Sequence, residues 1–430
     1  MKFKKADWIH NTNVYEVNLR QYSAEGTIKA FEKELPRLKD MGVAVLWFMP
    51  ITPIAQKEKK GSMGSYYACS DYTGVAAEFG TMQDFKSFVK MAQGMGFKII
   101  IDWVANHTGW DHVWTIIHPD YYKKDDATND FKRASGMDDI IELDYANPAL
   151  RMAMIAAMQY WVDECNIDGF RCDLAAWVQL DFWIEARTAL EKTKLLFWLA
   201  ECDGIDHAEY YKAFDACYCW TWMHKTAEFY RGSQDKQVLH NVIEHYSKSL
   251  SENDQVLWFT SNHDENSWNG TEYEKYGDAA KALAVFSCTW NGMPLVYSGQ
   301  EMPNHKRLKF FDKDAIEWDG AYRLHDFYKT LLNLHSSNAA LRGGDAGVIT
   351  QIVSSNADHH VFAFLRKNNN DEVLVLINFS QYGIDCTLFN DKLGGHFINV
   401  FTSETLNVNE VKHFELIPWG YLVFEKKSAD

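Results

Sequence analysis

The chain has 430 residues, 47% of them hydrophobic, which is enough for a large soluble domain accompanied by a smaller one. Its formal net charge of −16 argues against nucleic acids and anionic membranes as partners, because both are negatively charged. No apolar run approaches the roughly 18 residues that a membrane-spanning helix needs.

Short apolar strands alternate with amphipathic helices from about residue 14 to about residue 340. Eight strands are expected, at residues 14–19, 43–48, 98–102, 167–171, 195–200, 214–218, 255–260 and 293–298. Alternation of this kind is typical of parallel α/β architecture, and eight parallel strands are the number that closes a barrel. Their nearly continuous apolar character indicates burial on both faces. The sequence therefore predicts a (β/α)8 TIM barrel.

Two segments interrupt the alternation. Residues 103–147 contain a polar stretch without a clear period, which is too long for an ordinary loop and favours a small inserted subdomain. After about residue 343 the hydrophobic pattern changes to a period of two, as in antiparallel strands. We therefore expect four segments: the first part of the barrel (1–102), the insertion (103–147), the second part of the barrel (148–342) and a C-terminal antiparallel β domain (343–430).

The helix that opens the second part of the barrel has clear start signals. Asn147 is expected to cap its N-terminus, and Pro148 occupies the first helical position. An apolar stripe follows, with Met158 and Trp161 among its members, which indicates packing against the barrel.

Ionisable and polar residues follow four of the expected strands. They are Asp102, Asn106 and His107 after the third strand, Arg171 and Asp173 after the fourth, Glu201 after the fifth, and His263 and Asp264 after the seventh. In a parallel barrel the ends of the strands converge on one face, which is where catalytic side chains lie. Any one of these residues alone would more often be a loop carboxylate or a helix cap. Together, at four strand ends, they indicate an active site.

The motifs that contain these residues resemble those of the α-amylase family of glycoside hydrolases. "DWVANHT", "GFRCDLA", the Glu in "WLAECD" and "TSNHDEN" match that family's four signatures in content, order and approximate spacing. "GVAVLWFMPI", "YACSDY" and "GMPLVYSGQE" give further matches along nearly the whole chain. The resemblance implies that the insertion is the family's small inserted domain and that the C-terminal unit is its β-sandwich.

The resemblance implies that Asp173 is the nucleophile, Glu201 the general acid/base, and Asp264 a carboxylate that holds sugar hydroxyls. Glycosidic cleavage develops oxocarbenium character, so it needs one ionised carboxylate and a second carboxyl that is protonated at rest. Neighbouring anions and a semi-buried pocket are expected to raise the pKa of Glu201. The family retains anomeric configuration, which requires these two carboxyls to lie about 5–5.5 Å apart.

The same match implies a set of substrate-binding residues around the catalytic carboxyls. They are Tyr67, Asp102, His107, Arg171 and His263. Arg171 is expected to hold Asp173 ionised, and Asp102 to support the site through hydrogen bonds, including one to Arg171. The match implies that the bound sugar stacks on Tyr67. Tyr66 is next to it in the chain and is the alternative for this role. For each histidine the alternative is a structural role.

Two residues depart from the family pattern. Many members place Lys and His shortly after the nucleophile, where this chain has Ala176 and Trp177. A structural calcium at Asn106, which the resemblance implies, is therefore in question, and the chemistry itself needs no cofactor. Other oxygen ligands could come from Asp125, Asp126, Asp130 and Asp144, although acidic loops are more often simply solvated. Trp177 is a candidate apolar platform on the reducing side of the scissile bond.

The resemblance thus implies a retaining enzyme that cleaves α-glucosidic bonds, mainly α-1,4, in starch-like glucans or malto-oligosaccharides. The alternatives are a transglycosylase that uses the same residues and a catalytically silent carbohydrate-binding protein. The eight cysteines form no CxxC motif and lie within expected strands and helices, which favours a reducing compartment and hence the cytoplasm. A secreted chain whose leader had been removed is the alternative, and the oligomeric state stays open.

Overall fold

The computed structural model describes residues 3–232, 237–389 and 393–426. Eight parallel strands form a closed barrel in chain order, which confirms the predicted TIM barrel and each of its strands. They are β1 (Val14–Val17), β2 (Val45–Phe48), β3 (Lys98–Trp103), β6 (Gly169–Cys172), β7 (Phe197–Asp203), β8 (Ala216–Tyr218), β9 (Gln255–Trp258) and β10 (Met293–Tyr297).

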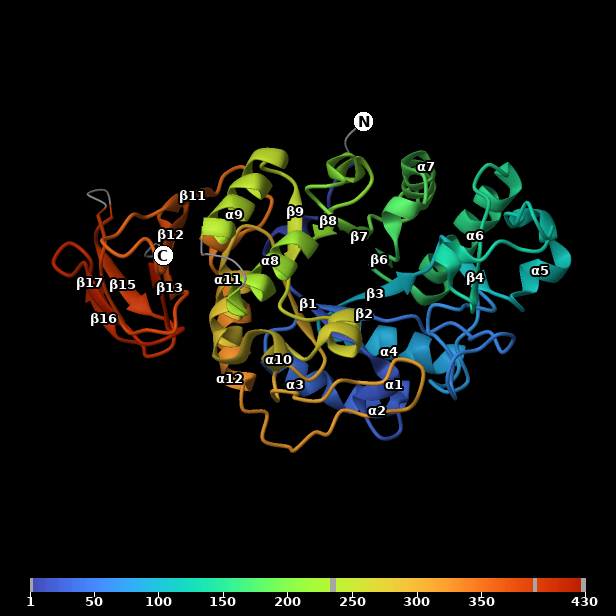
Figure 1. Cartoon of the computed structure of the whole chain (residues 1–430), viewed down its shortest axis with the longest axis horizontal. Helices are drawn as coiled ribbons and strands as arrows, with labels where there is room; N and C mark the ends of the chain where they lie inside the picture. Colours follow the sequence, from blue (N-terminus) through green and yellow to red (C-terminus); the bar gives the residue numbers. More distant parts are fainter. Residues whose placement is uncertain (1–2, 233–236, 390–392, 427–430) are drawn as a thin grey trace.

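Helices surround the barrel (Figure 1). The longer ones are α4 (Met82–Gly94), α6 (Pro148–Cys165), α7 (Leu180–Leu190), α8 (Trp220–Tyr230), α9 (Gln237–Ser249), α11 (Ala280–Thr289) and α12 (His325–Ser337). The shorter ones are α1 (Leu19–Tyr22), α2 (Ile28–Phe31), α3 (Leu35–Asp40), α5 (Val113–Ile117) and α10 (Glu272–Tyr276). Within the described ranges, no helix combines the length and apolarity that crossing a bilayer would take.

Helix α6 begins and ends where its capping residues place it. The Asn147 side chain accepts a hydrogen bond from the Ala149 amide at 2.9 Å, and Pro148 takes the first helical position, as predicted. At the other end Asn166 adopts a left-handed conformation with φ of 53°, which stops the helix. The predicted apolar stripe faces the core, where Trp161 is fully buried.

The segment between β3 and α6 contains little regular structure. A two-stranded antiparallel ribbon joins β4 (His107–Gly109) to β5 (Ile140–Glu142), and α5 lies between them in the chain. This segment occupies one end of the molecule, at the right of Figure 1.

Antiparallel strands occupy the opposite end, shown in orange and red in Figure 1. A six-stranded sheet has the order β11-β12-β13-β18-β15-β16, and β14 pairs with β17 in a second, two-stranded sheet. The strands are β11 (Ile349–Ile352), β12 (Val361–Asn368), β13 (Asp371–Asn378), β14 (Ile384–Thr387), β15 (His396–Asn399), β16 (Thr405–Asn407), β17 (His413–Leu416) and β18 (Tyr421–Lys426). Apolar side chains from both sheets share a small core of their own.

One face of the six-stranded sheet packs directly on the barrel's outer layer. Trp290, at the end of α11, contacts the rings of Phe362 and Phe364 of β12, with centroids 5.6 and 4.9 Å apart. Phe286 of α11 lies 6.2 Å from Phe362. These rings belong to the same hydrophobic cluster as the barrel interior, so the barrel and the sheet share one core.

Candidate active site

The side chains that follow the barrel strands meet around Arg171, which is completely buried. Its Nη1 donates to Asp102 Oδ1 at 2.9 Å and to Asp173 Oδ1 at 3.0 Å. Its Nη2 lies 2.9 Å from Glu201 Oε2, and its Nε donates to the Tyr218 hydroxyl at 3.1 Å. The Nη2 contact lacks the alignment of a hydrogen bond and is an ion pair only. One guanidinium thus connects carboxyls from three strands.

Close packing of β6 against β7 brings these groups together. Gly169 opens β6, and a methyl group at this position would lie 2.1 Å from the Phe197 carbonyl oxygen of β7. Only a residue without a side chain allows that approach. The pairing that follows aligns Arg171 with Leu199, two residues before Glu201.

Glu201 is held by a strained neighbour of Asp173. Its Oε2 accepts a hydrogen bond from the Leu174 amide at 2.8 Å, and Leu174 has φ of 42°, a left-handed conformation unusual for leucine. Such strain persists where the surrounding structure imposes it, as it commonly does at functional sites. Burial raises the pKa of Glu201 to about 7; the Arg171 charge opposes this shift and the Asp173 carboxylate adds to it.

Asp173 has one engaged and one free carboxyl oxygen. Oδ1 accepts from Arg171, whereas Oδ2 is buried without a hydrogen-bond partner. Burial raises the pKa of Asp173 to about 7; Arg171 opposes the shift, and the nearby Asp102 and Asp264 carboxyls add to it. A buried carboxylate oxygen without a partner is costly, so it marks a position where a ligand would supply the missing contact.

Tyr67 and His263 form a second part of the site. The Tyr67 hydroxyl lies 2.7 Å from His263 Nε2 and donates to Asp102 Oδ2 at 3.3 Å, and the two rings are stacked 5.5 Å apart. Asp264 Oδ2 is 3.2 Å from the same Nε2. Tyr66 instead donates to Asn18 at 3.1 Å, so the structure places Tyr67, and not its neighbour, among the carboxyls.

Sequence reasoning missed Glu16 of β1. This completely buried carboxyl lies 2.5 Å from His263 Nδ1 through Oε1, and its strand β1 is separated from β6, which carries Arg171, by β2 and β3. Burial raises the pKa of Glu16 to about 8 and lowers the pKa of His263. Each shift favours the uncharged form of its group. A carboxylate inside an apolar strand was the signal that could have identified it.

His107 lies beside the site, and Asn106 turns toward it. His107 Nε2 is buried without a partner, and burial lowers the pKa of His107 to about 4, so the ring is neutral. Asn106 Nδ2 lies 3.3 Å from His107 Nδ1.

A calcium ion at Asn106, which the resemblance implies, would take oxygen ligands from carboxylates, side-chain amides or backbone carbonyls. No three His, Cys, Asp or Glu side chains of the described ranges are grouped so as to hold a metal. The acidic residues of the insertion serve local turns instead: Asp125 Oδ1 accepts from Ala127 and Thr128 amides, and Asp144 Oδ1 from the Ala146 amide. We therefore derive no role for a metal.

A cleft of about 560 Å³ opens beside Glu201 and Asp264. Trp177, which is 51% exposed, lines it three residues after Leu174. Trp220 and His224 of α8 also line it, with their rings stacked 5.9 Å apart. The cleft thus has aromatic side chains next to the carboxyl groups, which suits the flat apolar face of a sugar ring.

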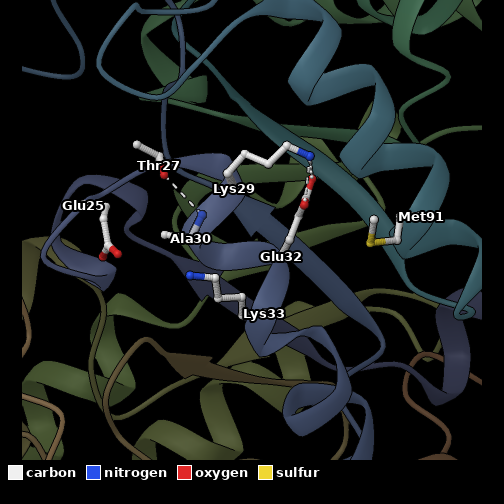
Figure 2. A pocket seen from close by; sticks show the side chains of 7 residues that line it. All are labelled: Glu25, Thr27, Lys29, Ala30, Glu32, Lys33 and Met91. Carbon is white, nitrogen blue, oxygen red and sulfur yellow. Dashed lines mark hydrogen bonds and ion pairs between the residues drawn. The ribbon is translucent and has the colours of Figure 1, made fainter.

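A second hollow lies on the outside of the barrel, around α2 (Figure 2). There Lys29 pairs with Glu32 at 3.1 Å, and Thr27 Oγ1 accepts from the Ala30 amide at 3.2 Å. These contacts are an ion pair within one turn and a helix cap. The hollow therefore offers no grouping comparable to that around Arg171.

Comparisons with known proteins find similar sequences and a similar fold. The model of the α-amylase catalytic domain matches residues 9–135 and 118–319. An α-amylase of Haloarcula japonica is 26% identical over 397 residues, which cover 87% of this chain and 56% of the relative. A cyclomaltodextrinase of Geobacillus thermopakistaniensis is 22% identical over 489 residues, covering 99% and 79%. The solved structure of a maltogenic α-amylase from Thermotoga neapolitana matches with a TM-score of 0.87 at 26% identity, covering 98% of this chain and 100% of that one.

Proposed function

The chain belongs to the α-amylase family, and from that premise we propose that it is a retaining glycoside hydrolase. Its substrates are α-glucosidic bonds, mainly α-1,4, in starch-like glucans or malto-oligosaccharides. The chain spans little more than half the length of its Haloarcula relative, so the proposal rests on the site itself. The observation that carries it is the single guanidinium that contacts Asp102, Asp173 and Glu201.

In the proposed first step Asp173 attacks the anomeric carbon through Oδ2, the oxygen without a partner. Glu201 transfers its proton to the glycosidic oxygen, so the bond to the leaving sugar breaks as the bond to Asp173 forms. In the second step Glu201 removes a proton from water, which attacks the same carbon and releases Asp173. The raised pKa of Glu201 supports this role, because the group must be protonated at rest.

The remaining site residues are proposed to bind the sugar at the cleavage point. His107 Nε2 is buried and unpartnered, so a sugar hydroxyl would satisfy it. Asp264 and His263 lie next to each other and are proposed to hold further hydroxyls, and Tyr67 to stack on the ring. Arg171, supported by Asp102, is proposed to orient Asp173 and to keep its carboxyl group ionised.

Two variants test the proposed roles. Glu201→Gln keeps the shape of the side chain but removes the proton donor, so kcat on starch should fall by about 10²–10⁴-fold. Asp173→Ala removes the covalent step and should abolish turnover, while malto-oligosaccharide binding stays measurable by calorimetry. Reducing-sugar release at the native rate from either variant would reject the role assignment.

A transglycosylase is the second candidate, favoured by the aromatic cleft beside Glu201. A sugar held between Trp177 and Trp220 would be positioned to intercept the covalent intermediate before water does. Product analysis on malto-oligosaccharides separates the two activities: longer chains indicate transfer, and only shorter chains indicate hydrolysis. A silent binding protein would release no sugar from any α-glucan, although Asp173, Glu201 and Asp264 are all present.

A further inference from the structure

Two cysteine side chains lie close together, and one of them, Cys202, directly follows the proposed acid/base Glu201 in the chain. Cys202 Sγ of β7 is 3.9 Å from Cys217 Sγ of β8, and both side chains are buried. Cys202 is one of the residues that line the cleft, and it is 6% exposed. Neither thiol has a role in the proposed hydrolysis.

An irregularity in the sheet brings the two thiols together. Ala200 pairs with Cys217 and Asp203 with Tyr218, so β7 carries two residues between these pairs where β8 carries none. Those two residues are Glu201 and Cys202. Bulges of this kind re-aim side chains next to active sites. The same distortion thus accounts for the positions of the proposed acid/base and of the thiol pair.

We propose that Cys202 and Cys217 form a thiol pair that a low-molecular-weight disulfide can oxidise through the cleft, and that the resulting bond reversibly lowers kcat. The cross-link is independent of the enzymatic activity, whereas its effect on turnover rests on the proposed function. Each cysteine is adjacent to a residue in contact with Arg171, namely Glu201 and Tyr218. A movement of either cysteine therefore displaces the chain next to a residue that contacts Arg171.

The reaction balances in two exchange steps. The Cys202 thiolate attacks the external disulfide, forms a mixed disulfide and releases one thiol. Cys217 then attacks Cys202 Sγ, forms the internal disulfide and releases the second thiol. The protein loses two electrons and two protons, and the external disulfide is reduced to two thiols. The hydrogen bond with Cys217 and burial both raise the pKa of Cys202, so the first step is faster at alkaline pH.

Closing the bond requires a movement large enough to affect catalysis. The sulfurs must approach from 3.9 Å to the length of a disulfide, about 2.05 Å. Glu201 is bonded to the residue that moves, and its Oε2 is held by the Leu174 amide at 2.8 Å. A displacement of about 1 Å in an active site can cost about 10²-fold in rate. We therefore expect at least about a tenfold loss of kcat.

The test uses the full chain and 4,4′-dithiodipyridine, a small disulfide that releases a coloured thione. The reduced protein should release two thiones for each Cys202–Cys217 bond, keep no adduct on either residue, and yield a cross-linked peptide in the mass spectrum. Dithiothreitol should restore activity. Cys217→Ala should release one thione at this site and keep a pyridyl adduct on Cys202, and Cys202→Ala should keep its turnover in the reagent. Cys219→Ala is the matched control, because Cys219 is a buried cysteine two residues after Cys217. This variant should still form the Cys202–Cys217 cross-link.

Two outcomes overturn the inference. One is the absence of the Cys202–Cys217 peptide after prolonged treatment at alkaline pH. The other is a complete cross-link in a protein whose starch hydrolysis is unchanged. If the reduced protein hydrolyses no α-glucan, the proposed function fails, and the mass spectrum alone then decides whether the thiol pair forms its bond.

Discussion

Arg171 contacts the two central carboxyls in different ways. It donates an aligned hydrogen bond to Asp173 at 3.0 Å, whereas its 2.9 Å contact with Glu201 is an ion pair without that alignment. The charged Arg171 donor favours the ionised form of Asp173 more strongly than the neutral Leu174 amide favours that of Glu201, so Asp173 should lose its proton first. Repulsion between the two carboxylates then holds the remaining proton on Glu201. This order matches a nucleophile that is charged and an acid that is protonated.

The pH dependence of kcat/KM should therefore be bell-shaped around neutrality. Burial raises the pKa of both Asp173 and Glu201 to about 7, and their coupling separates the two steps. Activity should fall on the acidic side as Asp173 becomes protonated, and on the alkaline side as Glu201 loses its proton. Initial rates on a malto-oligosaccharide across the pH range measure both limbs.

Glu201→Gln provides the control for this profile, because the alkaline limb should disappear with the group that titrates there. A native profile that stays flat down to the ordinary carboxyl range, about pH 4, would contradict the proposed charge states.

Most residues of the carboxyl cluster around Arg171 could be identified from the sequence, but not all of the contacts in the site. Asp102, Arg171, Asp173, Glu201 and Asp264 could be found because each follows an apolar strand whose end faces the same side of a barrel. Their roles stay predictions. The contact between Glu16 and His263 could not be found, because it joins β1 to the loop after β9 and depends on how the barrel closes.

Among the elements, the strand positions were predictable and the strand distortions were not. The fifth strand was expected to end at residue 200, but β7 continues to Asp203. Two extra residues bulge out before pairing with β8 resumes. A hydrophobic pattern indicates which residues are buried, but it contains no signal for a shift in the register between two strands. The neighbouring thiols, 15 positions apart, were hidden for the same reason.

The cap of α6 gives a prediction at the scale of one element. Asn147→Ala removes the acceptor of the Ala149 amide, and it also removes a 2.9 Å hydrogen bond to Asp120. The free energy of unfolding should fall by about 1–2 kcal/mol. Denaturant unfolding measures the change.

Met152→Ala is the matched control, because this exposed residue lies in the same helix and alanine favours helices. Its effect should stay within about 0.5 kcal/mol. Equal losses in both variants would show that the cap does not carry the effect.

For the whole molecule, the shared core is the feature that no sequence pattern specified. Alternating apolar residues indicated a C-terminal sheet, but not that Phe362 and Phe364 would pack on Trp290. Such contacts depend on how the surface of the folded barrel fits the surface of the folded C-terminal sheet. Local periodicity in the sequence does not encode that fit. The fold class was therefore predictable, and the docking of its parts was not.

Because of this shared core, the barrel and the C-terminal sheet should unfold together. Trp290→Ala leaves a cavity between them and should cost about 3–5 kcal/mol. Calorimetry should show a single transition that moves to lower temperature. Phe389→Ala, at an exposed ring of the same C-terminal region, should leave the transition nearly unchanged. Two transitions, only one of them shifted by Trp290→Ala, would contradict a common core.

The crowding of carboxyls around one guanidinium has a consequence for how stability and activity are related. Burial raises the pKa of Asp264 to about 6, so its charged form is less favourable in the folded chain than in the unfolded one. Its contribution to stability is therefore lost as pH rises from about 4 through 6. At pH above this window the free energy of unfolding of Asp264→Asn should exceed that of the native chain by about 0.5–2 kcal/mol. The same variant should lose turnover. Natural selection for stability alone would therefore not keep an acidic residue at position 264, whereas selection for turnover would.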